Sequence, residues 1–262
     1  MSVPANNKPT VLVVLPTLGE RLDTLEAALS SVETQRVDVA LTLAVVVPKS
    51  AKNARALCKK HGALVIDDPG SGMSAAINAG LAARTSEESY IWLGDDDAYR
   101  PGGLSTLLSL LSGRDDAVVA YGGCDYVDDK GSVLWSSRAG DLAKWLVGIG
   151  PNLIPHPAAL IRLDALESVG GYDESLSLVM DLDVFLKLKK KGSFVSTRDV
   201  VSAFGWHPDS LTVQDRSRSG AEARMVKRRH LNPVLRAIEP LWEYPVSWAS
   251  HVAARRLNRQ RS

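Results

Sequence analysis

Short apolar runs alternate along the chain with longer stretches in which apolar residues recur at helical spacing. The run TVLVVLPT at 10–17 is continuous and rich in β-branched residues, which is typical of a strand buried on both faces of a sheet. Three further runs have strand character, at 39–48, 63–68 and 89–94. Helical spacing fills the intervals between them, at 22–35, 53–62 and 72–85. This alternation predicts an α/β fold with a Rossmann-like, mostly parallel central sheet flanked by helices.

Beyond residue 111 the alternation weakens. Residues 117–138 are typical of two strands joined by an Asp-Asp-Lys-Gly turn, and 193–208 of a closing strand. Between them, the stretch MDLDVFLKLKKKG has a helical apolar face, and from residue 216 the chain turns basic and then aromatic. The predicted divisions are a domain at 1–215, its halves at about 10–115 and 116–215, and a helical tail at 216–262.

The composition limits the classes of function. The 262 residues are 45% hydrophobic and 23% charged, which is ordinary for a globular chain with a sizeable core. A net charge of +1 gives no electrostatic reason to expect a nucleic-acid partner. Cys58 and Cys124 lie far apart in sequence and fit no metal-binding spacing, so we expect two reduced thiols.

Two features bear on where the protein works. The start MSVPANNKPT lacks the basic and apolar regions of a signal peptide, and no apolar run approaches the ~20 residues that span a bilayer. We therefore expect a soluble, cytoplasmic protein. The tail combines Arg/Lys clusters with Trp242, Tyr244 and Trp248, so it could attach the protein peripherally to the inner face of the membrane. Packing on the main domain and a homodimer contact are the alternatives, and Pro240 and Pro245 interrupt any long amphipathic helix.

Three consecutive aspartates, Asp95 to Asp97, follow the strand at 89–94. Exposed turns tolerate such runs, but carboxylate oxygens are also the ligands that hard divalent cations prefer. Thr17 and the Asp67-Asp68 pair likewise follow strands. Because parallel strands end at one edge of a sheet, where ligands bind, we expect these polar groups to converge there.

Four blocks of the chain follow one another in order: VLVVLPTLGERLDTLEAALSSVETQ, GSGMSAAINAGLAA, YIWLGDDDAYRPGGL and HPAALIRLDALESVGGYDESLSLVMDLDVFLKL. Together they resemble the family 2 glycosyltransferases. The resemblance covers roughly residues 10–212 and implies a GT-A catalytic domain at 1–215, with a donor half at 10–115 and an acceptor half at 116–215. It also implies an inverting transfer of a sugar from a nucleotide-sugar, with UDP- or dTDP-sugars favoured, to a glycan, lipid-linked or other hydroxyl acceptor.

The resemblance also implies how the donor is held. Donor-binding residues are expected at Thr17, Glu20, Arg21, Asp68, Asn78, Asp95 and Asp96. Mn²⁺ or Mg²⁺ is expected to neutralise the diphosphate, and its candidate ligands are Asp97, Asp95 and His207. Asp97 is favoured as the direct ligand, with Asp95 or Asp96 contacting ribose or metal. One common register of the family motif would place its first carboxylate at Gly94.

A general base must take the proton from the acceptor hydroxyl. Asp181 matches the family's catalytic carboxylate, with Asp183 as a second acceptor-side candidate. Because positions 181 and 183 of a helix do not share a face, one base rather than a carboxylate pair is expected. Asp181 could instead, or in addition, cap the helix that follows. His156 matches a position beside the acceptor site, and packing is its alternative role; an ordinary loop histidine is the alternative for His207.

The chain also departs from the family pattern. Pro48 and Lys49 stand where many relatives carry an aspartate that reads the pyrimidine edge, and Ile77 replaces a common arginine. Two rival functions therefore stay open. A nucleotidyltransferase would also place a metal on an α/β sheet, although PTLGER has a single glycine where that class uses a Gly-rich loop. A non-catalytic nucleotide-sugar-binding relative is the other.

Overall fold

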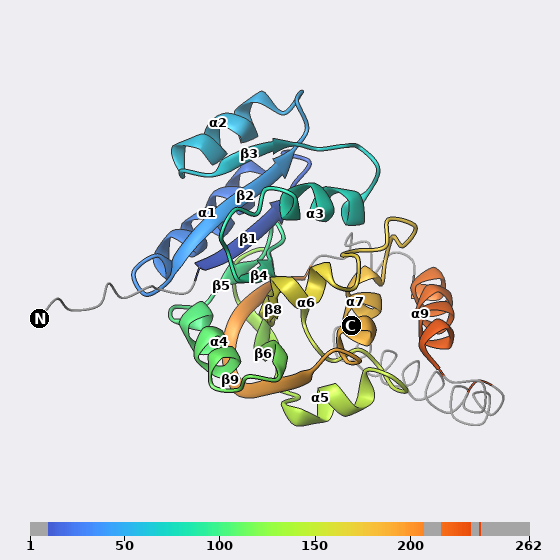
Figure 1. Cartoon of the computed structure of the whole chain (residues 1–262). Coiled ribbons are helices and arrows are strands. Elements are labelled where there is room, and N and C mark those ends of the chain that lie inside the picture. The colour runs from blue at the N-terminus through green and yellow to red at the C-terminus, as the bar shows by residue number, and fades with distance from the viewer. Residues whose placement is uncertain (1–9, 207–215, 232–235, 237–262) are drawn as a thin grey trace, which may run out of the picture.

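The computed structural model describes residues 10–206, 216–231 and 236. In these segments one nine-stranded sheet runs through the molecule in the order β3-β2-β1-β4-β8-β6-β9-β5, with β7 paired to β6 (Figure 1). The strands of the first half are β1 (Thr10–Pro16), β2 (Ala40–Val47), β3 (Leu64–Asp67), β4 (Ser89–Trp92) and β5 (Ala98–Tyr99). Those of the second half are β6 (Ala117–Val127), β7 (Val133–Ser137), β8 (Ala159–Arg162) and β9 (Ser193–Gly205).

The first half is the parallel layer that the sequence predicts. β1 pairs in parallel with both β2 and β4, and β2 pairs in parallel with β3. Alternate residues of β1 enter opposite cores: Leu12 and Val14 face one, and Val11, Val13 and Leu15 the other. A strand covered on both faces needs apolar residues at every position, and this explains the unbroken run in the sequence.

The second half turns the sheet. β8 runs antiparallel to both β4 and β6, whereas β6 and β9 are parallel. The predicted hairpin is confirmed, because β6 and β7 pair antiparallel around the turn at 128–131. β8 was assigned no structure from the sequence, yet this four-residue strand joins the two halves.

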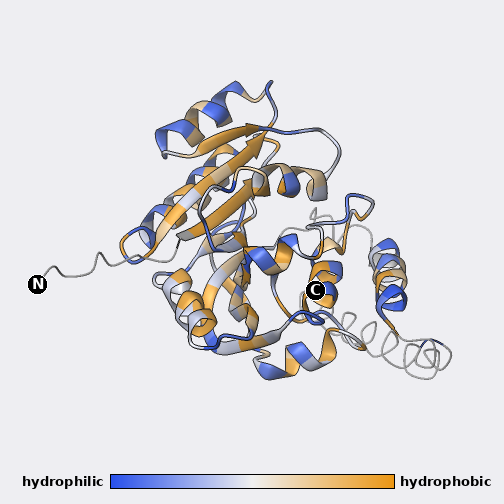
Figure 2. Cartoon of the chain, in the orientation of Figure 1, coloured by the Kyte–Doolittle hydropathy of each residue, from blue (hydrophilic) through white to orange (hydrophobic). Residues whose placement is uncertain are grey.

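Helices cover both faces of the sheet, and Figure 2 shows the apolar strands between helices of mixed character. One core includes residues of α1 (Leu22–Gln35), α2 (Lys52–Lys60) and α4 (Gly103–Ser112). The opposite core includes residues of α3 (Met73–Leu81), α5 (Asp141–Leu146), α6 (Leu163–Glu167), α7 (Met180–Leu188) and α9 (Arg216–His230). A single 3₁₀ turn, η1 (His156–Ala158), precedes β8. The expected GT-A-type α/β architecture is confirmed.

The first fifteen residues of the tail form α9, which packs against α7. Val226 is fully buried in the same core as α7. Of the three roles considered for the tail, packing on the main domain therefore holds for 216–230. Trp242, Tyr244 and Trp248 lie outside the described residues. None of the described helices combines the length and apolar composition needed to cross a bilayer.

Candidate active site

The Asp turn and the loop after β1 meet at one edge of the sheet, as expected from the parallel pairing of β1 and β4. Thr17 donates its hydroxyl hydrogen to Asp95 Oδ2 at 2.6 Å, across 78 residues of sequence. The Arg21 guanidinium spans the pair, with 2.6 Å to Asp95 Oδ1 and 2.9 Å to Asp96 Oδ2. Burial raises the pKa of Asp95 despite the hydrogen bond from Thr17 and the charge of Arg21. Two carboxylates from one turn therefore already converge on a cationic group.

Asp97 has a different environment. Only 2% of the residue is exposed, Oδ2 accepts the Gly94 N–H at 3.1 Å, and Oδ1 accepts the Gly205 N–H at 3.0 Å. Burial and the nearby Asp96 charge raise the pKa of Asp97 well above its usual range. Both oxygens of Asp97 thus accept backbone N–H groups, and the carboxylate joins the turn after β4 to the end of β9.

Gly94 explains why the motif register is shifted. A Cβ atom at position 94 would lie 2.6 Å from Asp97 Oδ2 and 3.0 Å from Asp96 Oδ1. The space for a side chain is therefore filled by the Asp97 carboxylate. A first carboxylate at Gly94 is incompatible with this packing.

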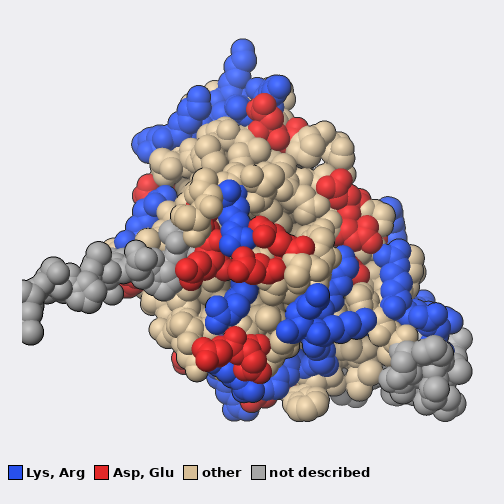
Figure 3. All heavy atoms as spheres, viewed as in Figure 1, with Lys and Arg blue, Asp and Glu red and all other residues tan. Residues whose placement is uncertain are grey.

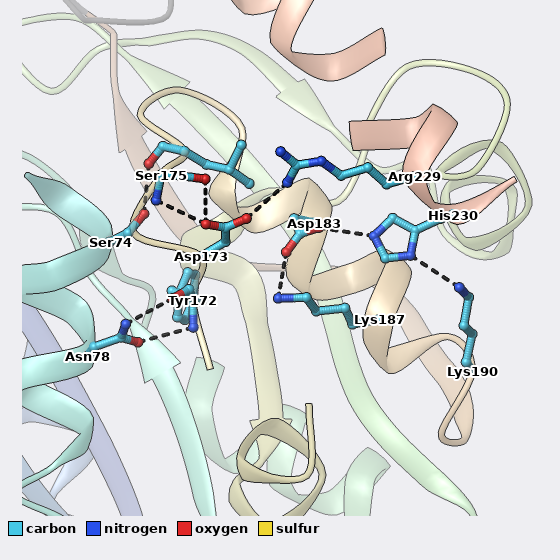
Figure 4. A network of polar contacts seen from close by, with 11 residues as sticks. Ser74, Asn78, Tyr172, Asp173, Ser175, Asp183, Lys187, Lys190, Arg229 and His230 are labelled. Atoms are coloured by element: carbon cyan, nitrogen blue, oxygen red, sulfur yellow. Dashed lines mark hydrogen bonds and ion pairs between the residues drawn. The ribbon is translucent and has the colours of Figure 1, made fainter. Parts of the chain in front are cut away.

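The other donor-side candidates lie apart from this pair. Glu20 is exposed on the same loop as Thr17 and Arg21, and half-buried Asp68 accepts the Gly70 N–H at 2.9 Å after β3. Asn78 holds a turn of the second half: Oδ1 accepts the Tyr172 N–H at 3.0 Å, and Nδ2 donates to the Tyr172 carbonyl at 2.9 Å (Figure 4). Its amide thus bridges the halves of the chain. The structure brings Thr17, Arg21, Asp95 and Asp96 together, whereas the hydrogen bonds of Asp68 and Asn78 described above go to other residues.

Asp181 lies in the first turn of α7, where Val179 is the N-cap residue. The side chain is partly exposed, and Oδ2 accepts a hydrogen bond from Asn152 Nδ2 at 2.9 Å. The protein atoms packed around the carboxyl raise its pKa to about 6, against the opposing effect of the Leu182 and Asp181 N–H groups and Asn152. A carboxylate with a pKa just below neutrality is charged at pH 7 and still basic enough to accept a proton.

Asp183 points elsewhere, as its helical position predicts. It is 2% exposed and forms contacts of 2.7 Å to Lys187 Nζ and 3.0 Å to His230 Nε2 (Figure 4). Burial alone would raise the pKa of Asp183, but the bonds from His230 and Lys187 outweigh it and lower the pKa. Oδ2 pairs with Lys187 on the same helix, and Oδ1 joins α7 to His230 of α9, so both carboxylate oxygens of Asp183 have protein partners.

His156 is stacked on Trp92, with 4.5 Å between ring centroids and 4° between planes. Its Nε2 lies 2.7 Å from the Tyr172 hydroxyl, and burial lowers its pKa to about 3. The ring is therefore neutral near pH 7 and joins an aromatic cluster, as in the packing alternative. His207 lies outside the described residues.

One residue was missed by sequence reasoning. Glu222 of α9 accepts the N–H groups of Ser177, Leu178 and Val179 at 3.1, 2.8 and 3.0 Å. These three residues lead directly into α7 and Asp181. Arg229 of α9 also pairs with Asp173 at 2.9 Å (Figure 4). No local sequence signal identifies Glu222, because the contact spans more than forty residues.

The possible metal ligands are few. In the described part of the chain, no three His, Cys, Asp or Glu side chains form a group that could hold a metal ion. Asp95 and Asp96 provide two carboxylates, and these already bind one positive charge, the guanidinium of Arg21. Oxygen ligands of this kind fit Mg²⁺ or Mn²⁺, which commonly complete their shells with water and substrate phosphate.

A mostly parallel sheet flanked by helices, with carboxylates after the strand β4, is consistent with a GT-A fold. The sequence model of glycosyl transferase family 2 matches residues 12–168, which is more than half of the chain. The chain therefore belongs to this family and is a glycosyltransferase. This membership removes the nucleotidyltransferase alternative.

Solved structures with the same fold are distant in sequence. Mannosyltransferase PcManGT from Pyrobaculum calidifontis, in complex with GDP-Man and Mn²⁺, superposes with a TM-score of 0.64 at 17% identity, covering 95% of this chain and 76% of that one. S. aureus TarS 1–349 in complex with UDP-GlcNAc gives 0.64 at 12% identity, covering 88% and 69%. Another S. aureus TarS structure gives 0.61 at 14% identity, covering 88% of this chain and 41% of that one. No curated protein matches the sequence.

The Glu222 contacts generate a first prediction. Glu222→Ala leaves three backbone N–H groups without their acceptor, so we expect a loss of about 1–3 kcal/mol of unfolding free energy. Hydrogen exchange at the amides of residues 177–179 should accelerate, and kcat should fall because this segment positions Asp181. Glu222→Gln, which keeps one acceptor oxygen, should lie between the variant and the wild type. Urea titration and amide exchange provide the measurements.

Arg224→Ala is the matched control, since Arg224 is exposed on the same helix. It should change neither the unfolding free energy, nor amide exchange at residues 177–179, nor kcat. Unaltered exchange at 177–179 in Glu222→Ala would show that this carboxylate does not hold the segment.

Proposed function

We propose that this glycosyltransferase performs a metal-dependent, inverting transfer of a sugar from a nucleotide-sugar to a hydroxyl group of a glycan or lipid-linked acceptor. The observation that carries the proposal is the separation of two kinds of carboxylate. Asp95 and Asp96 both pair with Arg21 at the edge of the first half, whereas Asp181, whose pKa is raised, lies in the first turn of α7 in the second half.

The acidic edge is suited to the donor. A bound Mn²⁺ or Mg²⁺ would supply positive charge to the diphosphate, whose negative charge grows as it leaves. We propose Asp95 and Asp96 as the residues that hold the ion, in place of Asp97. Arg21 then has two roles: it balances the two carboxylates before the ion binds, and its exposed guanidinium can turn toward a phosphate afterwards. Thr17 fixes the Asp95 carboxylate through its hydroxyl.

Asp181 is suited to the acceptor. In an in-line displacement the acceptor oxygen forms a bond to the anomeric carbon while the bond to the diphosphate oxygen breaks, and the hydroxyl proton passes to the base. Asn152 orients the Asp181 carboxylate by its hydrogen bond to Oδ2.

The nucleotide of the donor is a separate part of the proposal. UDP- and dTDP-sugars are our first candidates, and GDP-sugars join them because PcManGT was solved with GDP-Man.

Metal binding should separate Asp96 from Asp97. We expect Asp96→Asn to abolish Mn²⁺-dependent binding of UDP-, dTDP- or GDP-sugar in calorimetry and to leave the melting temperature nearly unchanged. Asp97→Ala should instead lower the stability measured at pH 4 by about 1–3 kcal/mol, because the buried Gly94 and Gly205 N–H groups lose their acceptor and, at this pH, the raised pKa of Asp97 leaves little cost of a buried charge to offset that loss. If Asp97→Ala melts like the wild type at pH 4 and loses Mn²⁺ binding, Asp97 is the ligand after all. Full wild-type turnover in excess EDTA would refute metal dependence.

Asp181→Asn should separate catalysis from stability. Removing a general base should lower kcat by about 10²–10⁴-fold, with donor affinity within a few-fold of wild type. The pKa of Asp181 is higher in the folded chain than the ordinary ~3.9, so the charged carboxylate costs stability as pH rises through 4 to 6. Asp181→Asn should therefore stabilise the fold by up to about 3 kcal/mol at pH 8 and by little at pH 4. Turnover assays and urea titrations at both pH values measure this.

Asp183→Asn is the matched control on the same helix. It breaks a buried ion pair and should destabilise the fold by about 3–5 kcal/mol.

In the wild type, kcat should fall as pH drops below about 6, the pKa of Asp181. Survival of turnover in Asp181→Asn would place the base elsewhere, and collapse of donor binding would place Asp181 on the donor side.

The stereochemistry of the product is a separate test. A single carboxylate base implies one displacement, so a D-gluco donor that is α-linked to its nucleotide should give a β-linked product. The anomeric proton coupling in an NMR spectrum of the product reports the outcome directly. A retained α-linkage would exclude the single-displacement proposal.

A further inference from the structure

The short helix α5 presents opposite faces to the core and to the solvent. Ala143 and Val147 are fully buried in the core shared with α7. Leu142, Trp145 and Ile149 are 56%, 70% and 49% exposed. Leu142 and Trp145 are three residues apart on α5, which places them on one side of the helix, and Ile149 follows in the turn after it. We call these three residues the apolar ridge. Three large apolar side chains in a row on a surface need an explanation, whereas single ones do not.

Cations surround this ridge. Lys189, just after α7, donates its ammonium hydrogen to the Lys144 carbonyl at 2.9 Å, which fixes the end of α7 beside α5. On the other side, the Arg198 side chain lies 3.5 Å from the Cβ position of Gly140, the residue before α5. The basic collar, as we define it, consists of Arg138, Lys144, Lys189, Lys190, Lys191 and Arg198.

Two carboxylates, those of Asp141 and Asp199, lie beside the six cations of the collar. Asp141 pairs with Lys144 at 2.7 Å and accepts the Ser196 hydroxyl at 3.1 Å, and Asp199 bonds to Thr197. Lys190 Nζ approaches His230 Nδ1 at 3.3 Å, so the cationic surface continues to α9. On the face viewed in Figure 3, Lys and Arg gather over the lower part of the molecule and along α9, with a cluster of Asp and Glu beside them at the lower left.

We propose that the apolar ridge of α5 and its basic collar form a surface that docks on an anionic phospholipid bilayer. An apolar ridge with Trp and Leu inserts into the boundary between head groups and acyl chains, and Lys and Arg around it attract anionic head groups. This surface belongs to the described main domain and is distinct from the aromatic part of the tail beyond residue 231.

A second copy of the chain is a poorer occupant. A two-fold contact through the ridge would bring the two collars together, and their like charges would repel. An anionic lipid surface satisfies both the apolar and the cationic part of the surface at once. Charge complementarity therefore favours the bilayer.

The docking surface is connected to the candidate base. The segment after α5 runs from Val147 to Asn152, whose amide bonds to Asp181 Oδ2 at 2.9 Å. A docked molecule would hold the Asp181 side of the site near the lipid surface, which suits a lipid-linked acceptor. This consequence rests on the proposed function. The docking itself requires no donor, metal or turnover.

The test is co-sedimentation of the full chain with vesicles of phosphatidylcholine alone or of phosphatidylcholine with phosphatidylglycerol, without donor or metal. We expect binding to the anionic vesicles that weakens with added salt. Leu142→Ser/Trp145→Ser should reduce the partition coefficient by at least about tenfold. Lys191→Glu/Arg198→Glu should reduce it by about fivefold or more for each cation lost. Leu64→Ser is the matched control, since Leu64 is 48% exposed on edge strand β3 of the first half.

Each outcome decides the proposal. All changed side chains are exposed, so melting temperatures should stay at the wild-type value and loss of binding is not loss of folding. Absence of wild-type binding, or binding that the ridge variant retains, overturns the proposal; in the second case another segment docks. Self-association that the ridge variant abolishes, without vesicle binding, assigns the ridge to a second copy. Transfer to a soluble acceptor, assayed separately, would persist in the ridge variant, so failure of docking and failure of the proposed function are distinguishable.

Discussion

A single buried carboxylate determines the geometry of the acidic edge. Asp97 accepts one N–H from the end of β4 and one from the end of β9, strands that are not neighbours in the sheet. Gly205 has to be small at this junction, because a Cβ there would lie 2.4 Å from the Asp96 carbonyl oxygen. Asp95 and Asp96, which precede Asp97 in the same turn, contact the loop that carries Thr17 and Arg21.

Hydrogen bonds from α3 and α9 position the segment of the second half that leads to Asp181. The α3 residues Ser74 and Asn78 hydrogen-bond to the 172–176 segment, and Glu222 of α9 holds the residues that follow it. Gly170 and Gly171 form the turn that leads into this segment, with φ of +80° and +66°. Asp181 is therefore positioned from both sides, by the first half through α3 and by the tail through α9. Its distance from the acidic edge is set by packing rather than by any direct bond.

Electrostatics divides the carboxylates by task. Asp183 is buried but fully paired, so its pKa is lowered and its charge stabilises the fold. Asp181 lacks a cationic partner among its hydrogen bonds, so burial raises its pKa and the folded chain carries a cost at neutral pH. A group retained in an unfavourable environment is typical of a functional site. The two aspartates are two residues apart on one helix, and their side chains point to different partners.

The sequence by itself determined the elements whose signal is local. The runs of β1, β2 and β4 predicted buried parallel strands, the helix at 22–35 was predicted with its observed bounds, and the order of strands predicted that Thr17 and the Asp turn would meet. Helical spacing also predicted that Asp181 and Asp183 diverge. These conclusions follow from the periodicity of strands and helices and need no knowledge of distant residues.

Only the tertiary structure distinguished the surroundings of the individual carboxylates. Asp95, Asp96 and Asp97 are identical in sequence terms, and their difference comes from Gly205, which lies 108 residues from Asp97. β8 is too short to show a periodicity, and Glu222 acts across 43 residues or more of chain. Contacts between distant residues depend on how the elements pack in space, and for Asp97 and Glu222 no local pattern records that packing.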